Sequence, residues 1–132
     1  MIEKEVVGSF ILHRGKMLLL KRSPSHSYGN RWCAVSGFIE KGETPYQAAL
    51  RETLEETSIE PKDLKLIKEA SIVKIQEEDV LWIIHPFLFE TDSDKIKLER
   101  EHKEYRWISP EEIYKFDFVI GLDKDMKALG LI

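Results

Sequence analysis

Residues 37–59 read GFIEKGETPYQAALRETLEETSI, and the helix that this stretch predicts organises the rest of the chain. Thr44 is followed by proline at the first helical position and by Gln47 three residues later. This pattern is a capping box, in which both side chains satisfy backbone N–H groups that a helix start leaves unpaired. Since Pro61 cannot continue a helix, the sequence predicts a helix over residues 45–57.

The predicted helix has an apolar face and an acidic face. At about 100° per residue, most apolar side chains fall within roughly one third of the circumference, and we expect this stripe to pack on a sheet. The stripe consists of Tyr46, Leu50, Thr53, Leu54 and Thr57, with Ala49 at its margin. Three glutamates lie on the opposite side, at spacings of three and four residues: Glu52, Glu55 and Glu56.

These glutamates repel one another, because each like-charge pair at helical spacing costs about 0.2–0.5 kcal/mol. One interpretation is a plain solvated face. The other is that a divalent cation removes the repulsion, and oxygen ligands on one rigid face suit Mg²⁺ or Mn²⁺. Gly37 could bring its backbone carbonyl close to a metal, and Glu43 could pair with Arg51 and tie the loop to the helix.

The rest of the chain predicts a mixed α/β fold. Two apolar runs, at 5–12 and 17–21, flank a polar turn and indicate a hairpin, and the runs at 64–75 and 80–89 indicate a second hairpin. Further predicted elements are strands at 31–35 and 103–108, a short helix opening at Ser109 and a helix over 122–129. This order indicates a sheet covered by helices in a single domain, residues 1–132.

Composition limits the partners and the compartment. The 24 acidic and 20 basic residues give a net charge of −4, so the chain has no general attraction to nucleic acid or anionic lipid. The single cysteine, Cys33, excludes an internal disulfide and is interpreted as a small buried residue. No secretory signal or bilayer-length apolar run is visible, so the sequence predicts a cytoplasmic protein without membrane partners. The scattered histidines show no metal-ligand spacing and are expected to be structural or exposed: His13, His26, His85 and His102.

Residues 37–59 closely resemble the signature of the Nudix (MutT-like) hydrolases. Seven positions match that signature: Gly37, Glu43, Arg51, Glu52, Glu55, Glu56 and Ile59. Thr53 stands where an aliphatic residue is usual, and Ser58 stands where the last glycine is usual. Residues 32–37 and 101–107 look most like the branch that hydrolyses dATP and dihydroneopterin triphosphate.

The resemblance implies the Nudix α/β/α sandwich, with a central mixed β-sheet and a carboxylate-bearing catalytic helix. It also implies hydrolysis of a substrate that contains a nucleoside diphosphate, with Mg²⁺ or Mn²⁺ as cofactor. By the same resemblance Glu55 and Glu56 are metal ligands, Glu52 is a ligand or a base for water, and the Gly37 carbonyl is a further ligand. Glu43 and Arg51 match the supporting salt bridge.

The resemblance also implies a further carboxylate from a loop near the last strand. Glu101 is the candidate, as a metal ligand and catalytic residue, and Glu104 is its competitor. Either Glu52 or Glu101 is expected to accept the proton of the attacking water.

Other side chains are candidates for binding the substrate. Arg22 is favoured over Lys21 and Arg31 for the phosphates. The candidates for stacking on a base are Phe38, Tyr28 and Trp82, because amphipathic rings suit nucleobases.

The substrate class is predicted from the same resemblance. Enzymes of the family that act on ADP-ribose tend to carry a proline where this chain has Lys74, and those that act on diadenosine polyphosphates tend to carry a tyrosine where residues 75–77 lie. With neither marker present, we expect a nucleoside triphosphate or deoxynucleoside triphosphate to be split into the monophosphate and pyrophosphate. The alternatives are an ADP-ribose, sugar-nucleotide or dinucleoside polyphosphate hydrolase, and a non-catalytic nucleotide sensor. Dimers are common in the family, so a homodimer is compatible with the resemblance.

Overall fold

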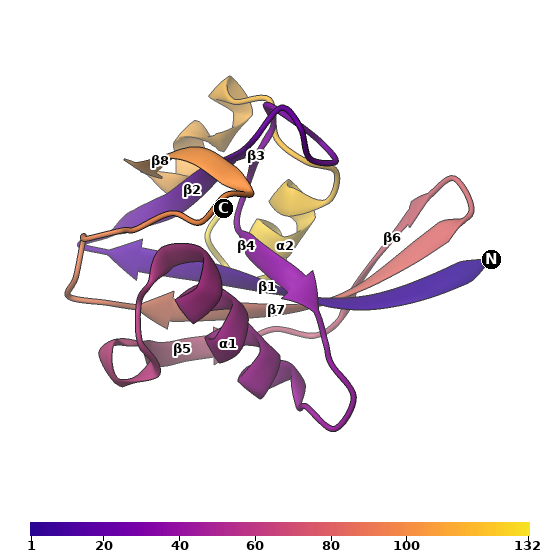
Figure 1. The fold of residues 1–132 in the computed structure, drawn as a ribbon, viewed down its shortest axis with the longest axis horizontal. Helices are drawn as coiled ribbons and strands as arrows, with labels where there is room; N and C mark the ends of the chain where they lie inside the picture. The colour runs from indigo at the N-terminus through magenta and orange to yellow at the C-terminus, as the bar shows by residue number, and fades with distance from the viewer.

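Eight strands form one mixed sheet in the computed structural model, which describes residues 1–132 (Figure 1). The strands are β1 (Ile2–His13), β2 (Lys16–Arg22), β3 (Trp32–Cys33), β4 (Val35–Phe38), β5 (Lys65–Glu69), β6 (Val73–Glu77), β7 (Val80–Glu90) and β8 (His102–Ile108). The helices are α1 (Pro45–Thr57), α2 (Leu122–Ala128) and two 3₁₀ turns at Pro61–Asp63 and Pro110–Lys115. None of these helices is both long enough and apolar enough to cross a bilayer.

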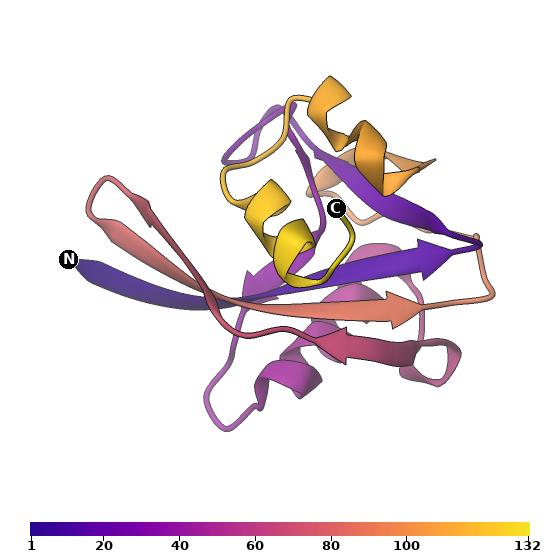
Figure 2. The same ribbon diagram turned by 180° about the vertical axis from the view of Figure 1, so that it is seen from behind.

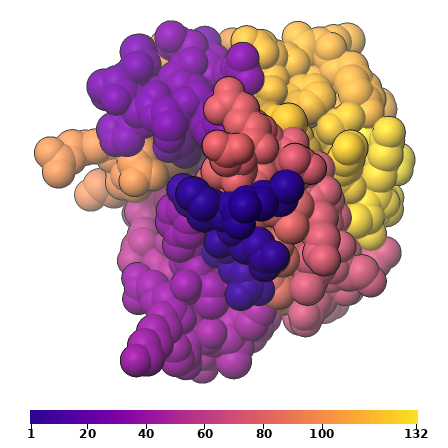
Figure 3. Space-filling model, turned by 90° about the vertical axis from the view of Figure 1, so that its right-hand side faces the viewer, coloured from indigo at the N-terminus to yellow at the C-terminus, as the bar shows by residue number.

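Strand β1 holds the sheet together. It pairs in parallel with β7, from Ile2 opposite Val80 to Leu12 opposite Glu90. The other strand pairings are antiparallel, along the path β3-β2-β1-β7-β5, with β4 on β1, β6 on β7 and β8 on β2. Figure 3 shows the N-terminal end of β1 beside the hairpin of β6 and β7. The predicted mixed sheet and second hairpin are therefore confirmed.

The helices cover opposite faces of the sheet, with α1 in front in Figure 1 and α2 in front in Figure 2. Successive residues of a strand point to opposite faces. Val7 of β1 accordingly packs with Ala48 and Ala49 of α1, whereas Phe10 belongs to the apolar cluster that contains Met126 of α2. The predicted α/β/α arrangement is confirmed.

The predicted strand at 64–75 is two strands, β5 and β6, that both pair with β7. The break faces Pro86, which has no N–H to donate and so interrupts the ladder. The Ala70 N–H donates to the Pro86 carbonyl at 3.0 Å, and the pairing resumes with Val73 opposite Ile84. A proline in the partner strand thus divides a run that is continuous in sequence.

Helix α1 begins and ends where the sequence predicts. The Thr44 hydroxyl accepts a hydrogen bond from the Gln47 N–H (3.1 Å), and the Gln47 side-chain oxygen accepts one from the Thr44 N–H (2.9 Å). At the other end Ser58 has a φ of 68°, the left-handed conformation for which glycine is usual, and its N–H donates to the Leu54 carbonyl at 2.9 Å.

The face that α1 turns to the sheet differs from the predicted stripe. Tyr46 and Leu54 are 39% and 42% exposed. The buried residues of the helix are Ala48, Ala49, Thr53, Glu56 and Thr57. Part of the acidic face therefore lies against the protein and not in solvent. Most of the predicted stripe is nevertheless buried or half-buried, at Ala49, Leu50, Thr53 and Thr57, so the helical wheel was wrong about Leu54 and Glu56.

Candidate active site

Arg51 is the centre of a network that joins α1 to the loop after β4. Its guanidinium donates to both carboxylate oxygens of Glu43, with Nε to Oε2 at 2.7 Å and Nη2 to Oε1 at 2.9 Å. Nη1 donates to Oε1 of Glu52 at 2.7 Å and to Oε2 of Glu55 at 3.3 Å. Nη2 also donates to the Phe38 carbonyl at 3.0 Å. One side chain thus fixes the loop and two of the candidate carboxylates.

The ion pair between Glu43 and Arg51 keeps both groups charged. The Arg51 hydrogen bonds, together with one from the Glu40 N–H, lower the pKa of Glu43 to about 2. The hydrogen bonds that Arg51 donates to Glu43, and less strongly to Glu52, raise the pKa of Arg51 above its usual value. A bidentate arginine–carboxylate pair also fixes orientation, so the loop geometry is well defined.

Gly37 of β4 is the point of closest approach between sheet and helix. A Cβ built on Gly37 would overlap the carboxyl group of Glu52. Only glycine leaves that space free, and its absence of a side chain is what lets the carboxylate lie on the strand. The Gly37 backbone and the Glu52 carboxylate are therefore neighbours.

Glu56 lies one turn further along α1 and is only 3% exposed. Neither of its carboxylate oxygens has a hydrogen-bond partner. Burial, and then the neighbouring Glu52 carboxylate, raise the pKa of Glu56 well above its usual value. Glu55, by contrast, has a side chain that is 56% exposed.

Glu52 and Glu56 fit a divalent cation, which would supply the positive charge that a buried Glu56 carboxylate needs as its partner. A buried carboxylate without a partner is costly, and a metal ion is one of the few groups that offsets that cost. No three acidic, histidine or cysteine side chains converge closely enough to hold an ion by themselves. Magnesium commonly uses one or two carboxylates together with water and substrate phosphate, so this partial set is the type it takes.

His102 lies behind Glu56, and sequence reasoning did not assign it to the site. Its side chain is fully buried, with Nδ1 3.0 Å from Oε1 of Glu99 and Nε2 3.8 Å from Oε1 of Glu56. Nε2 is also 3.6 Å from the Cys33 sulfur. Burial lowers the pKa of His102 and raises the pKa of Cys33 to about 12. Both groups are therefore neutral, and Cys33 is a buried thiol. The position of His102 directly after Glu101 was the only signal in the sequence.

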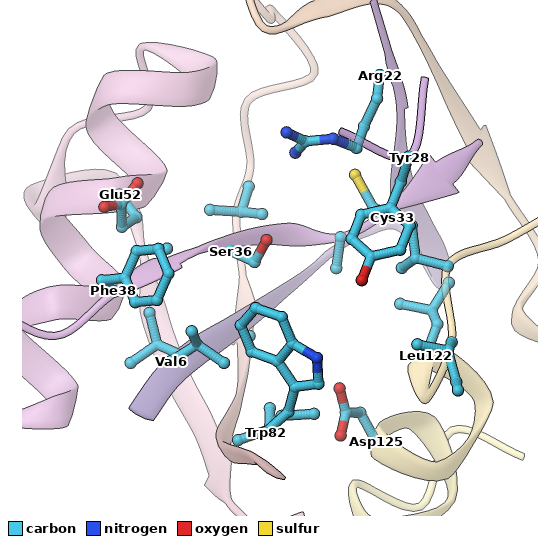
Figure 4. A pocket seen from close by; sticks show the side chains of 18 of the residues that line it. Val6, Arg22, Tyr28, Cys33, Ser36, Phe38, Glu52, Trp82, Leu122 and Asp125 are labelled. Carbon is cyan, nitrogen blue, oxygen red and sulfur yellow. The ribbon is translucent and has the colours of Figure 1, made fainter. Parts of the chain in front are cut away.

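A cavity of about 460 Å³ opens beside these residues, a size typical of small-molecule sites (Figure 4). The sequence candidates that line it are Arg22, Tyr28, Gly37, Phe38, Glu52, Trp82 and Glu101. Four others lie outside the lining: Glu43, Arg51, Glu55 and Glu56. Figure 4 shows Glu52 and Phe38 at one end of the cavity, Arg22 projecting from above, and Trp82 with Asp125 below.

The aromatic candidates are held in place by a shared carboxylate. The Tyr28 hydroxyl and the Trp82 Nε1–H both donate to Oε1 of Glu77, the latter at 3.2 Å. The rings of Phe38 and Trp82 are 6.3 Å apart, and the Lys4 ammonium is 5.5 Å from the Trp82 ring. Rings from β4, β7 and the loop before β3 thus meet around one cavity. No local sequence pattern predicts this arrangement.

The competing sequence candidates lie elsewhere. Glu104 is 3.8 Å from Lys21 and 3.7 Å from Arg106, and it does not line the cavity. Arg31 lies 4.0 Å from Asp117 on the surface. Among the basic and acidic alternatives, Arg22 and Glu101 are therefore the ones that the fold brings to the cavity.

Asp125 of α2 lines the same cavity, and sequence reasoning did not single it out. It is 6% exposed, and its Oδ1 is buried without a hydrogen-bond partner. Burial, and then the charge of Asp123, raise the pKa of Asp125 to about 7. The sequence did contain a signal, because Asp125 is an acidic residue on a helical face that it shares with the apolar Leu122, Met126 and Leu129.

Comparison with known proteins agrees with this geometry. The family model described as NUDIX domain matches residues 3–128. The chain is 31% identical over 106 residues to the pig (Sus scrofa) bis(5'-nucleosyl)-tetraphosphatase [asymmetrical], covering 76% of this chain and 67% of that protein. It is 24% identical over 141 residues to the nucleoside triphosphatase NudI of Escherichia coli, covering 100% of both chains. Among solved structures, the MutT protein from Methanosarcina mazei Go1 superposes with a TM-score of 0.80 at 26% identity, covering 94% of this chain and 89% of the other.

Proposed function

This chain belongs to the NUDIX family of hydrolases, and on that premise we propose that it splits a nucleoside triphosphate or deoxynucleoside triphosphate into the monophosphate and pyrophosphate, with Mg²⁺ as cofactor. One observation carries the proposal. The buried, unpartnered Glu56 lies next to Glu52, and Glu52 lines a cavity that also presents Arg22 and aromatic rings. The cavity therefore combines a positively charged side chain that can bind phosphates with aromatic rings that can stack on a base.

The proposed cofactor site is centred on Glu52 and Glu56. Glu55, Glu101 and the Gly37 carbonyl are further proposed ligands, which would have to move towards the ion since no three of these side chains converge, and Mn²⁺ is the alternative ion. A bound divalent ion would neutralise phosphate charge and make a bound water more acidic. Glu56 would be the most deeply placed ligand, and the exposed Glu55 would be the most mobile. Arg51 orients Glu52 and Glu55 through its hydrogen bonds to both.

The chain's residues then position the water and the phosphates. In the hydrolytic step the water oxygen forms a bond to phosphorus and the bond from that phosphorus to the bridging oxygen breaks. A carboxylate, Glu52 or Glu101, accepts the proton of the water, and both line the cavity. Arg22, whose Nε donates to the Ser27 carbonyl at 2.6 Å, would bind a phosphate oxygen. Phosphoryl transfer depends mainly on such positioning and electrostatics.

A nucleoside triphosphate is favoured over the alternative substrates. Lys74 and residues 75–77 lack the proline and tyrosine expected of the ADP-ribose and diadenosine polyphosphate branches. The relative NudI, which aligns over its whole length, is named a nucleoside triphosphatase. The second candidate is a dinucleoside polyphosphate, favoured by the name of the pig relative. A cytoplasmic location, a homodimer and the absence of nucleic-acid partners remain predictions from the sequence.

The test is a Mg²⁺-dependent screen of nucleoside and deoxynucleoside triphosphates, ADP-ribose, sugar nucleotides and dinucleoside polyphosphates, with products separated by ion exchange. We expect monophosphate and pyrophosphate from at least one triphosphate. Glu56→Gln should lose at least about 100-fold in kcat, because the charge that holds the cofactor is gone. The matched control is Glu60→Gln, an exposed glutamate just beyond the same helix, which should retain full activity.

Two results would overturn the proposal. Equal turnover by wild type and Glu56→Gln would reject the ligand assignment. Binding of a nucleotide without turnover of any substrate would favour a sensor.

A further inference from the structure

We propose that Glu99 is a positioning residue for the proposed hydrolysis, because its carboxylate holds the turn that presents Glu101 to the cavity. The inference rests on the proposed function, in which Glu101 is a cofactor ligand or the base for the attacking water. It adds a residue that touches neither substrate nor cofactor and acts through the two residues that it binds, Glu101 and His102.

Glu99 binds two consecutive residues with its two carboxylate oxygens. Oε2 accepts a hydrogen bond from the Glu101 N–H at 3.0 Å, and Oε1 lies 3.0 Å from Nδ1 of His102. The Glu99 side chain is 32% exposed, so these contacts are partly shielded from water. A carboxylate that uses both oxygens in this way is fixed in orientation, and it fixes the backbone of the turn in return.

The Glu101 carboxylate has no such support of its own. Glu101 lines the cavity but is exposed, and its carboxylate forms no hydrogen bond or ion pair. The location of this carboxylate therefore depends on where the backbone of residue 101 is held. A side chain that is free on a fixed backbone can still turn towards an ion or a water molecule, and the proposed cofactor site requires such a movement.

Ser23 holds the same turn from its other side. The Ser23 N–H donates to the Glu101 carbonyl at 2.8 Å, and the Ser23 hydroxyl donates to the Arg100 carbonyl at 3.0 Å. Both backbone polar groups of Glu101 are therefore bonded, the carbonyl by Ser23 and the N–H by Glu99. Since Ser23 directly follows Arg22, the turn is also held close to the proposed phosphate-binding residue.

The second contact of Glu99 orients His102. An ionised carboxylate only accepts, so the proton between the two groups is carried by Nδ1. Nε2 of the neutral ring is then an acceptor, and it lies 3.6 Å from the Cys33 sulfur and 3.8 Å from Oε1 of Glu56. The ring consequently offers no donor to Glu56, which leaves that carboxylate available to a cation. Residues behind metal ligands commonly affect metal affinity and activity in this indirect way.

The test measures kcat and KM on the best triphosphate, at saturating Mg²⁺, for wild type, Glu99→Ala and Glu99→Gln. Glu99→Ala should lower kcat by about 10–100-fold, the usual effect of removing a partner of a metal ligand. KM should change by less than about threefold, because Arg22 and the aromatic rings line the cavity independently of Glu99. Glu99→Gln keeps one acceptor oxygen, so it should lose less than Glu99→Ala. The control is Glu104→Ala, which removes a carboxylate that contacts Lys21 and Arg106 on the surface, and it should keep kcat within about twofold.

A double-substitution cycle separates positioning from a general effect on the fold. In a Glu101→Ala background, Glu99→Ala should lower kcat by less than about threefold, because the side chain that Glu99 positions is absent. The full loss in that background would show that Glu99 acts independently of Glu101, and it would refute the inference.

Two NMR measurements test the contacts without any turnover. The Glu101 amide should exchange with solvent faster in Glu99→Ala than in wild type, because its hydrogen bond is lost. The ring-nitrogen chemical shifts of His102 should show the Nδ1–H form in wild type and a mixture of the two forms in Glu99→Ala. If Glu99→Ala does not fold, Glu99→Gln serves for the same measurements.

The outcomes separate this inference from the proposed function. Unchanged exchange of the Glu101 amide, or full kcat in Glu99→Ala, would refute the role of Glu99 and leave the hydrolysis standing. If wild type hydrolyses no substrate, the proposed function fails, and the exchange of the Glu101 amide then decides separately whether Glu99 holds the turn.

Discussion

The carboxyl group of Glu52 lies against the Cα of Gly37, in the space that any side chain at residue 37 would occupy. This contact brings a glutamate of α1 to the backbone of β4. The contact depends on the missing side chain at residue 37.

Gly37→Ala should therefore displace Glu52. We expect a loss of about 1 kcal/mol or less in the free energy of unfolding, because the colliding atoms are the flexible end of the Glu52 side chain, which can swing away from the added methyl. Urea denaturation measures this loss. In a Glu52→Ala background the same substitution should cost much less, since the colliding atoms are absent. An equal cost in both backgrounds would show that Glu52 is not what the glycine accommodates.

Arg51→Lys should weaken both the fold and the activity. Lysine keeps the charge but cannot donate to Glu43, Glu52 and the Phe38 carbonyl at once, as Arg51 does. We expect a loss of about 1–3 kcal/mol in unfolding free energy, with a fall in kcat on the best substrate. Arg31→Lys is the control, because Arg31 has only a 4.0 Å surface contact with Asp117. Similar effects of the two substitutions would contradict the central role of Arg51.

Ser58→Gly should stabilise the protein. Ser58 ends α1 with a φ of 68°, where a side chain is strained and glycine is not. We expect a gain of about 0.4–1 kcal/mol, reduced by loss of the 3.3 Å hydrogen bond from its hydroxyl to the Lys97 carbonyl. The melting temperature reports the gain. Ser25→Gly, at a loop position without positive φ, should give no gain.

Stability should fall as pH rises from about 4 to about 7, through Asp125. The pKa of Asp125 is about 7 in the folded protein against 3.8 for an ordinary aspartate, so the folded state retains a proton that the unfolded state has lost over this range. The free energy of unfolding then decreases with pH, by on the order of 4 kcal/mol in total from this group.

Asp125→Asn removes that titration and should make the fall shallower, measured by chemical denaturation between pH 4 and pH 8 without nucleotide. The fall that remains is expected from Glu56, whose pKa is also raised. Asp117→Asn, an exposed aspartate, should leave the slope as in wild type. A wild-type slope that persists in Asp125→Asn would assign the titration to another group.

The sequence was most informative where the determinants are local. The capping box fixed the start of α1, because its hydrogen bonds join residues three apart, Thr44 and Gln47. The apolar runs likewise predicted the two hairpins, because the two strands of a hairpin are neighbours in sequence. The strand predicted over 64–75 was wrong in the middle because the interruption comes from Pro86, a residue of the partner strand.

Packing decided which side of α1 meets the sheet. Periodicity placed Tyr46 and Leu54 on the sheet. The Tyr46 ring does lie 6.0 Å from the Phe87 ring, but Leu54 is 42% exposed, and Glu56 of the acidic side is buried. The wheel gives relative angles around a helix and cannot say which side meets the sheet. Ala48 and Ala49 pack on Val7 and Phe87, and the missing side chain at Gly37 leaves room for the Glu52 carboxyl.

By itself, then, the sequence determined the α/β class, the helix α1 with its acidic side chains, and the family to which the chain belongs, because these depend on the order and spacing of residues along the chain. Only the tertiary structure decided that Glu56 is buried beside His102, that Arg22, Tyr28 and Trp82 share one cavity, and that Asp125 faces it from the other side of the sheet. These residues come from elements far apart in sequence, and strand pairing, not spacing, brings them together.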